Sequence, residues 1–251
     1  MQDPVSGDLA QLFYDQAIAK TVRVSSSRAA EATKLVENVF RAVNIALANE
    51  LKMVFDRMDL DVWEILDAAS TKPFGFMRFN PGPGWGGHCI PLDPFYLSWK
   101  AREYDFRTRF IELAGDVNIA MPYHVVDSVV AALNARKKTL NGSKVLVLGI
   151  AYKKDIDDLR ESPSLTIIEL LQKAGADVKY HDPYFAFVGR GRHYDLQMKC
   201  TPLEDLGQYD CVLIVTDHSN IDYRRVVEAA QLVVDTRNAT CGFNLFNIVR
   251  C

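Results

Sequence analysis

Lys144-Val-Leu-Val-Leu-Gly149 is the stretch that decides the fold of the second half of this chain. A short apolar run that ends at a glycine is typical of a strand buried on both faces of a parallel sheet. Outward from it, helices are predicted over 164–173 and 221–230, and further strands over 177–182, 211–217 and 232–235. Strands that alternate with helices predict an α/β domain with a Rossmann-like, doubly wound parallel sheet.

The first half of the chain is predicted to be all helical. Residues 28–58 contain no glycine or proline, and their apolar residues recur at three- and four-residue spacings, which indicates one long amphipathic helix. Helices of this length are often shared between domains or subunits, and Ser25, Ser26 or Ser27 is placed to cap its start. Shorter helices are predicted over 61–69, 94–103 and 109–137, and Pro122 is expected to kink the last one or to open a separate helix.

Composition and charge exclude several classes of protein. The net charge is −3 and no long basic run is present, so no nucleic-acid partner is expected. No apolar run approaches the roughly 18 residues of a membrane span, and the first residues lack the pattern of a signal peptide. Five cysteines without CxxC pairs predict neither a metal site nor a disulfide framework. We therefore expect a soluble, cytoplasmic protein with no metal and no membrane partner.

The segment Asn80-Pro-Gly-Pro-Gly-Trp-Gly-Gly-His-Cys-Ile-Pro-Leu-Asp93 is predicted to be a loop, because its glycines and prolines exclude a helix and a central strand. Its backbone can approach a ligand closely at the positions that carry no Cβ, which are Gly82, Gly84, Gly86 and Gly87. A lone cysteine is usually a small buried apolar residue. In this loop, with Asp93 four residues later, Cys89 is interpreted as a nucleophile.

The same glycines imitate a dinucleotide fingerprint. Gly82-Pro-Gly-Trp-Gly-Gly87 matches the pattern G-x-G-x-x-G. That pattern binds a pyrophosphate only between a strand and the N-terminus of a helix, and neither flank fits. The turn after Gly149 has only the first glycine of the pattern. No NAD-binding fingerprint is predicted.

Three segments together resemble a known family. They are Lys34-Leu-Val-Glu-Asn38 with Asn49-Glu50 after it, the loop from Gly82 to Asp93, and Gly149-Ile-Ala-Tyr-Lys-Lys-Asp-Ile-Asp-Asp-Leu-Arg-Glu-Ser-Pro163. In this order and at this spacing they resemble the UDP-sugar 6-dehydrogenases of the UDP-glucose/GDP-mannose dehydrogenase superfamily. The resemblance covers the chain from about Gly7 to Arg250.

The resemblance implies a domain organisation. Family members have an NAD-binding domain, a central helical dimerisation region and a C-terminal UDP-binding domain. Residues 21–138 resemble the central region, which contains the cysteine loop, and residues 139–251 resemble the UDP-binding domain. Residues 1–20 are interpreted as a remnant of the NAD domain or a leader. The chain is thus expected to be a fragment that lacks its NAD domain, and to form a homodimer through the long helix.

The resemblance also implies a reaction, the oxidation of a primary alcohol to a carboxylate by two NAD⁺. Cys89 matches the cysteine that adds to the intermediate aldehyde, so that a thiohemiacetal and then a thioester form. Lys34 and Asn38, at i and i+4, match the pair that stabilises the oxyanion and holds a water. Asp93 matches an aspartate expected to partner Lys34 or the water. By pattern alone Lys34 is a solvated surface charge and Asp93 a turn residue before proline.

Substrate-binding residues follow from the same resemblance: Phe79, Asn80, Gly82, Gly84, Gly86, Gly87, His88, Tyr152, Lys153 and Arg237. Arg160 matches an arginine on the NAD side, whereas Asp157, Asp158 and Glu161 are expected to hold their turn together. His88 stands where the UDP-glucose branch has serine, which favours UDP-N-acetylglucosamine or UDP-N-acetylmannosamine as substrate. Lys72 and Arg78 are both candidates for a residue that reaches a partner subunit.

Two other functions stay open. One is a stand-alone sugar-nucleotide-binding or dimerisation module without catalysis, which needs none of the four reactive side chains Cys89, Lys34, Asn38 and Asp93. The other is a 3-hydroxyacid dehydrogenase of similar architecture, which has no use for a loop cysteine. The cysteine therefore separates the enzyme from both alternatives.

Overall fold

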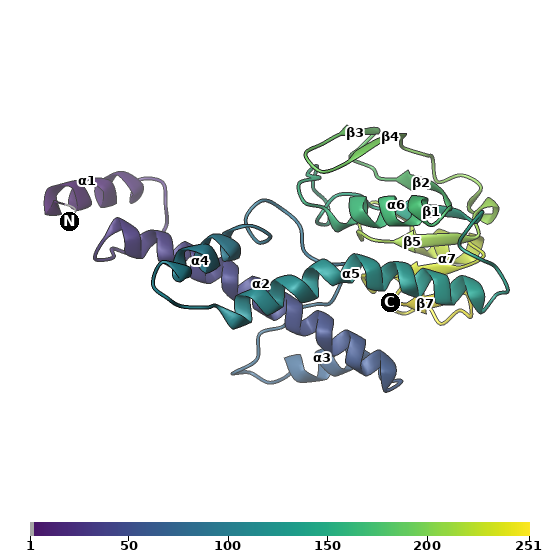
Figure 1. Ribbon diagram of the computed structural model, residues 1–251, viewed down its shortest axis with the longest axis horizontal. Coiled ribbons are helices and arrows are strands. Elements are labelled where there is room, and N and C mark those ends of the chain that lie inside the picture. Colours follow the sequence, from purple (N-terminus) through teal and green to yellow (C-terminus); the bar gives the residue numbers. More distant parts are fainter. Residues whose placement is uncertain (1–2) are drawn as a thin grey trace.

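The computed structural model describes residues 3–251, and its first half is helical as predicted. The long predicted helix is α2, and the N-terminal helix α1 lies at the end of the molecule farthest from the sheet (Figure 1). Ser26 caps α2, because its side chain accepts a hydrogen bond from the backbone N–H of Ala29. The helices of this half are α1 (Pro4–Tyr14), α2 (Ser27–Arg57), α3 (Val62–Ser70), α4 (Asp93–Arg102) and α5 (Arg109–Asn134).

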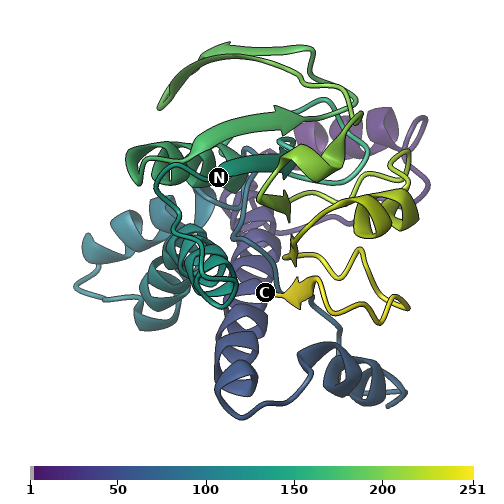
Figure 2. The same ribbon diagram turned by 90° about the vertical axis from the view of Figure 1, so that its right-hand side faces the viewer.

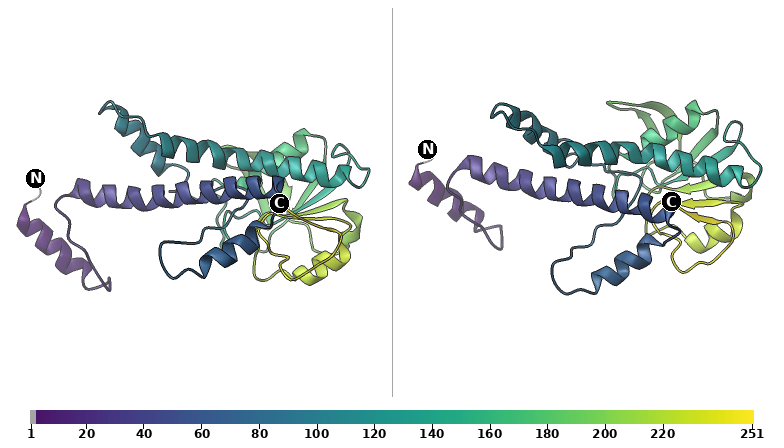
Figure 3. Two further views of the ribbon diagram at one scale, coloured as in Figure 1. Left: turned by 90° about the horizontal axis from the view of Figure 1, so that it is seen from below. Right: turned by 60° about the horizontal axis from the view of Figure 1, so that its bottom comes forward.

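Helices α2 and α5 lie side by side and run in the same direction toward the sheet (Figure 3). Pro122 lies inside α5 and does not divide it, so the expected separate helix is absent from the described chain. Proline has no N–H to donate to the carbonyl of Asn118, four residues earlier. A glycine of the cysteine loop packs close to that carbonyl, as described below.

The second half contains the predicted parallel sheet. Its strand order is β2-β1-β5-β6-β7, and every neighbouring pair is parallel. The strands are β1 (Lys144–Leu148), β2 (Asp177–His181), β5 (Cys211–Ile214), β6 (Val233–Asp235) and β7 (Ile248–Arg250). Helices α6 (Pro163–Lys173) and α7 (Tyr223–Ala229) and a short 3-10 helix η1 (Leu206–Gln208) connect them. A hairpin of β3 (Phe187–Arg190) and β4 (Asp195–Lys199) forms a separate two-stranded sheet, next to β2, with Val188 buried in the main core.

Helices cover both faces of the sheet, as a doubly wound fold requires. Val145 and Val147 of β1 pack with α5 and α6, whereas Leu146 and Leu148 point to the opposite face and pack with α7. All four are completely buried. The second half of α5 therefore belongs to the core of the sheet, while its first half packs on α2. The proposed boundary after residue 138 thus divides in sequence two regions that share α5 in space.

The end of the chain meets the long helix. The carbonyl of Arg250 lies 3.5 Å from Nζ of Lys52, which is buried and paired with Asp56. Figure 2 shows this C-terminal end beside the α2 ribbon. Among residues 3–251, no helix is long and apolar enough to cross a bilayer.

Candidate active site

Buried amides anchor the start of the cysteine loop. The backbone N–H of Gly82 donates to Oδ1 of Asn49 at 2.9 Å, and Nδ2 of Asn49 donates to Oδ1 of Asn118 at 2.9 Å. Nδ2 of Asn118 in turn donates to the carbonyl of Ala114 at 2.9 Å. Both asparagines are buried, so this chain of hydrogen bonds joins the loop to α2 and α5. Its members lie far apart in sequence. Gly82 and Asn49 belong to recognised segments, whereas Asn118 and Ala114 do not.

The glycines of the loop pack against protein. Gly84 has φ +121°, and a Cβ there would lie 3.0 Å from the carbonyl oxygen of Asn118, which Pro122 leaves without its helical donor. At Gly86 a Cβ would lie 2.6 Å from Cβ of Tyr152. Gly87 has φ +89° and faces the ring of Tyr152. These positions need glycine for packing, and their predicted contacts with a ligand stay a prediction.

A backbone hydrogen bond joins the loop to the sheet domain. The N–H of Gly87 donates to the carbonyl of Arg160 at 2.8 Å. Arg160 lies in the turn that follows β1, which also carries Tyr152 and Lys153. The structure therefore brings the cysteine loop and the predicted UDP-binding turn together.

Cys89 is an exposed free thiol in the loop, four residues before the start of α4. Its carbonyl accepts from the backbone N–H groups of Leu92 at 3.2 Å and Asp93 at 2.8 Å. Sγ lies 4.0 Å from Nδ1 of His88. Asp93 is in the first turn of α4, where the helix dipole favours a carboxylate.

Asn38 joins this group from α2. Its Nδ2 donates to Oδ2 of Asp93 at 2.6 Å, across 55 residues of sequence, and its side chain is completely buried. Its Oδ1 accepts from Nη2 of Arg41 at 2.7 Å. Arg41 was not singled out from the sequence, although its i+3 spacing from Asn38 places both on one face of the helix.

Lys34 differs from the expected arrangement. Its Nζ pairs with Glu37 at 3.1 Å, and both side chains are more than half exposed. Among the described residues its polar contact is to Glu37 and not to Asn38 or Asp93. In this conformation Lys34 is the solvated surface charge that its pattern alone suggests, and its part in an oxyanion site stays a prediction.

The turn after β1 is held by its own acidic residues. Asp158 accepts from the backbone N–H of Arg160 at 2.9 Å and pairs with its guanidinium at 2.7 Å. This hydrogen bond lowers the pKa of Asp158 and raises that of Arg160. Glu161 has φ +50° and lies 3.9 Å from Nε2 of His193. Asp158 therefore stabilises the turn as expected, whereas Asp157 is exposed.

Arg237 reaches the loop from the end of β6. Its Nε donates to the carbonyl of Val215 at 2.8 Å, and its guanidinium lies against Gly82, where a Cβ would approach Nη1 to 2.6 Å. Burial lowers the pKa of Arg237, and the carboxylates of Asp217 and Asp235 oppose that shift. A guanidinium so placed is a cation beside the loop backbone.

Phe79 and Asn80 precede the glycines. The ring of Phe79 packs edge-on against Phe40 of α2, with ring centroids 5.7 Å apart. Oδ1 of Asn80 accepts from Nε of Arg78 at 2.8 Å. Arg78 also pairs with Asp67, and the other candidate for a partner contact, Lys72, lies over the ring of Phe74.

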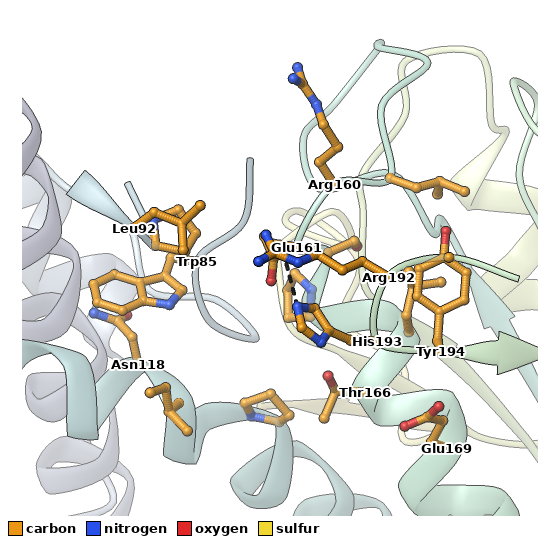
Figure 4. Close-up of a pocket in the computed structure, with 18 of the residues that line it drawn as sticks. Trp85, Leu92, Asn118, Arg160, Glu161, Thr166, Glu169, Arg192, His193 and Tyr194 are labelled. Carbon is orange, nitrogen blue, oxygen red and sulfur yellow. Dashed lines mark ion pairs between the residues drawn. The ribbon is translucent and has the colours of Figure 1, made fainter. Parts of the chain in front are cut away.

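A cavity of about 550 Å³ lies between α5, α6, the β3–β4 hairpin and the loop. Trp85 and Asn118 stand on one side, and Glu161, Arg192 and His193 face them (Figure 4). His88 and Arg160 also border it, but Cys89 does not. Within residues 3–251, no cluster of three or more His, Cys, Asp or Glu side chains is arranged to hold a metal ion.

Two family models match these regions. The central domain of the UDP-glucose/GDP-mannose dehydrogenase family matches residues 28–120, and the UDP binding domain of that family matches residues 146–241. Together they cover more than half of the chain. The protein belongs to the UDP-glucose/GDP-mannose dehydrogenase family, as the resemblance implied.

Several individual proteins of known activity are similar to this chain. The chain is similar to the UDP-N-acetyl-D-mannosamine dehydrogenase of Methanococcus vannielii, with 32% identity over 93% of this chain and 53% of that protein. It is 35% identical to the UDP-N-acetyl-D-glucosamine 6-dehydrogenase of Pseudomonas aeruginosa, over 86% of this chain and 50% of that protein. A structure of UDP-D-ManNAc dehydrogenase from Pyrococcus horikoshii matches with a TM-score of 0.84 and 29% identity, over 97% of this chain and 56% of that one. The chain spans about half the length of the curated relatives it matches.

Proposed function

We propose that the protein acts as an NAD-dependent UDP-sugar 6-dehydrogenase, which oxidises the C6 alcohol of a UDP-sugar to a carboxylate. One observation carries the proposal: an exposed thiol, Cys89, lies on a loop whose Asp93 is bonded to the buried amide of Asn38. A protein that only binds a sugar nucleotide needs no such group.

In the proposed reaction, separate residues of this chain act as the nucleophile, stabilise the oxyanion and hold the water at C6. The thiolate of Cys89 attacks the carbonyl carbon of the intermediate aldehyde, so that a C–S bond forms and the carbonyl electrons move to oxygen. Asn38 and Lys34 stabilise that oxygen. After the second oxidation gives a thioester, a water near Asp93 attacks it, the C–S bond breaks and the thiolate leaves. NAD supplies the hydride acceptor for both oxidations.

The nucleotide end of the substrate is assigned to the two segments that meet at Gly87 and Arg160. The loop from Phe79 to His88 provides backbone N–H groups, and Tyr152, Lys153 and Arg237 provide side chains for the UDP part. The names of the relatives, together with His88, support UDP-N-acetylmannosamine or UDP-N-acetylglucosamine as the sugar nucleotide.

Arg160 is the residue of this chain that we assign to NAD. Its side chain is 63% exposed at the edge of the loop, and a guanidinium suits a pyrophosphate. Its pairing with Asp158 holds it near the loop.

We further propose a homodimer through α2 and a cytoplasmic location. Several large apolar side chains of α2 are more than 40% exposed, among them Val36, Phe40 and Leu47, and such a face is typical of an interface. The five free cysteines suit a reducing compartment. Sedimentation of the chain at several concentrations tests the dimer.

Thiol labelling tests the proposed function directly. Cys89 and Cys241 are both exposed, so a limiting amount of an alkylating reagent should label both, and peptide mapping separates the two rates. UDP-N-acetylmannosamine should slow the labelling of Cys89, because the sugar covers its sulfur. Cys241 serves as the internal control.

Two outcomes would contradict the proposal that the protein is a UDP-sugar dehydrogenase. If the sugar nucleotide binds by calorimetry and leaves the labelling of Cys89 unchanged, the protein is a binding module. If it does not bind at all, the assigned UDP site is wrong.

A further inference from the structure

The turn that carries Tyr152 and Lys153 is clamped at its start by side chains from neighbouring strands. Oδ2 of Asp182, which follows β2, accepts from the backbone N–H groups of Ile150 at 2.7 Å and Ala151 at 3.1 Å. Oγ1 of Thr216, which follows β5, donates to the carbonyl of Ala151 at 2.6 Å. Oγ of Ser162 donates to the carbonyl of Ile150 at 2.7 Å. Both backbone groups of these two residues are therefore engaged by side chains.

A histidine clamps the turn at its other end. His218 is completely buried, and its Nε2 lies 3.0 Å from Oδ2 of Asp182. Its Nδ1 accepts from the backbone N–H of Asp155 at 3.0 Å. Because an N–H points at Nδ1, the ring proton is on Nε2 and is donated to Asp182. The carboxylate of Asp155 accepts from the backbone N–H and the hydroxyl of Ser219, at 2.8 and 2.7 Å.

Tyr152 and Lys153 lie between these two clamped points. Asp155 has φ +58°, a backbone conformation that a non-glycine residue rarely adopts unless its surroundings hold it there. His218 provides the contact that holds its N–H. Loss of His218 would leave the backbone N–H of Asp155 without its acceptor.

The clamp contains a buried carboxylate that the proposed chemistry does not use. Burial alone raises the pKa of Asp182, but the hydrogen bonds from His218, Ile150 and Tyr184 outweigh burial and leave its pKa below the usual value. His218 is neutral in this arrangement, so its contact with Asp182 is a hydrogen bond to a buried carboxylate. Through this bond and its own bonds to Ile150 and Ala151, Asp182 is connected to the backbone on both sides of Tyr152 and Lys153.

We propose that Asp182 and His218 are positioning residues for the UDP site, which together place Tyr152 and Lys153 against the nucleotide. This inference rests on the proposed function. The same two residues reach the cysteine loop indirectly, because Gly87 is bonded to the end of this turn at Arg160.

Replacement of His218 tests the proposal in the 251-residue chain. His218→Leu removes both hydrogen bonds, and His218→Asn keeps an acceptor near the position of Nδ1. UDP itself is the probe, titrated by calorimetry, and hydrogen exchange follows the amide of Asp155. We expect His218→Leu to weaken UDP binding on the order of tenfold, since a hydrogen bond to a charged group is lost, and to speed exchange at Asp155. His218→Asn should recover part of both.

Val227→Ala is the matched control for lost stability. Val227 is buried on the opposite face of the sheet, on α7, so its truncation destabilises the same domain without contact with the turn. If His218→Leu binds UDP as tightly as Val227→Ala does, or if exchange at Asp155 is unchanged, the positioning role is refuted. A wild-type chain that does not bind UDP refutes the proposed function itself, which is a separate result.

Discussion

Arg41 fixes the orientation of the amide that the proposed reaction uses. Its Nη2 donates to Oδ1 of Asn38, while Nδ2 of Asn38 donates to Asp93. An amide has two N–H groups, and the proposed reaction assigns the N–H of Asn38 that Asp93 does not use to the oxygen at C6. Without Arg41 the orientation of the amide depends on its bond to Asp93 alone.

Arg41→Met is therefore expected to impair the step at sulfur and to leave UDP binding unchanged. The C6 aldehyde of UDP-N-acetylmannosamine should protect Cys89 from alkylation about tenfold less well than in the wild type, a smaller effect than the loss of the donor itself. The protection is measured as the concentration of aldehyde that halves the rate at which Cys89 is labelled.

Arg41→Lys is the control, since it keeps a cationic donor at the same position. Equal protection of Cys89 in wild type and Arg41→Met would show that Arg41 has no part in the orientation of Asn38.

At the scale of elements, the pair of α2 and α5 forms the support of the cysteine loop. Asn49 of α2 and Asn118 of α5 bond to each other in a buried position, and Asn49 also holds Gly82. Buried polar groups are costly when one partner is removed. The two helices and the loop are thus coupled by one amide pair.

Asn118→Ala should lower the free energy of unfolding by about 1–3 kcal/mol, because it leaves Nδ2 of Asn49 without its acceptor. Urea denaturation gives the value. Asn44→Ala is a matched control on α2, since among residues 3–251 the amide of Asn44 bonds within its own helix, to the carbonyl of Phe40. A similar loss in both variants would argue against a special role for the amide pair.

Elements with a strong periodic pattern could be predicted from the sequence, and short ones could not. The long helix α2 begins within one residue of its expected start, and the buried strands β1 and β5 are where their apolar runs indicated. The hairpin of β3 and β4 and the three-residue strand β7 were missed, because their pairing partners are known only in space. Pro122 opens no separate helix, since α5 continues through it, and the alternative of a kink stays a prediction.

Some residues of the candidate site could also be predicted from the sequence, and others could not. Asn38 and Asp93 are joined by a hydrogen bond, and Asp93 is bonded through its backbone N–H to the carbonyl of Cys89, yet Lys34 turns to Glu37. The catalytic roles of these residues stay a prediction. Arg41 and His218 carried no signal in the sequence, because a hydrogen-bonding partner across strands or on a polar helix face has no characteristic spacing. The position of His218 just after a buried strand was the one available indication.

For the molecule as a whole, acid stability is linked to the sheet domain. The pKa of Asp182 is lower in the folded protein than its usual value, since hydrogen bonds from His218 and backbone N–H groups outweigh burial. A group with a depressed pKa stabilises the fold above its unfolded pKa, and this contribution disappears as the pH falls through the folded pKa.

The free energy of unfolding should therefore decrease between about pH 5 and pH 2, and Asp182→Asn should make that decrease shallower. Urea denaturation across this range measures both. Asp157→Asn changes an exposed carboxylate of the adjoining turn and should leave the slope as in the wild type. An unchanged slope in Asp182→Asn would show that this carboxylate does not contribute.

The contact between Gly87 and Arg160 has a consequence for biosynthesis. The cysteine loop leaves the ribosome before the turn on which its glycines pack has been translated. At about 5–20 residues per second, the delay is on the order of seconds. During that interval the loop lacks its bond to Arg160, and the nascent thiol of Cys89 is exposed to oxidation before the sheet domain can fold beside it.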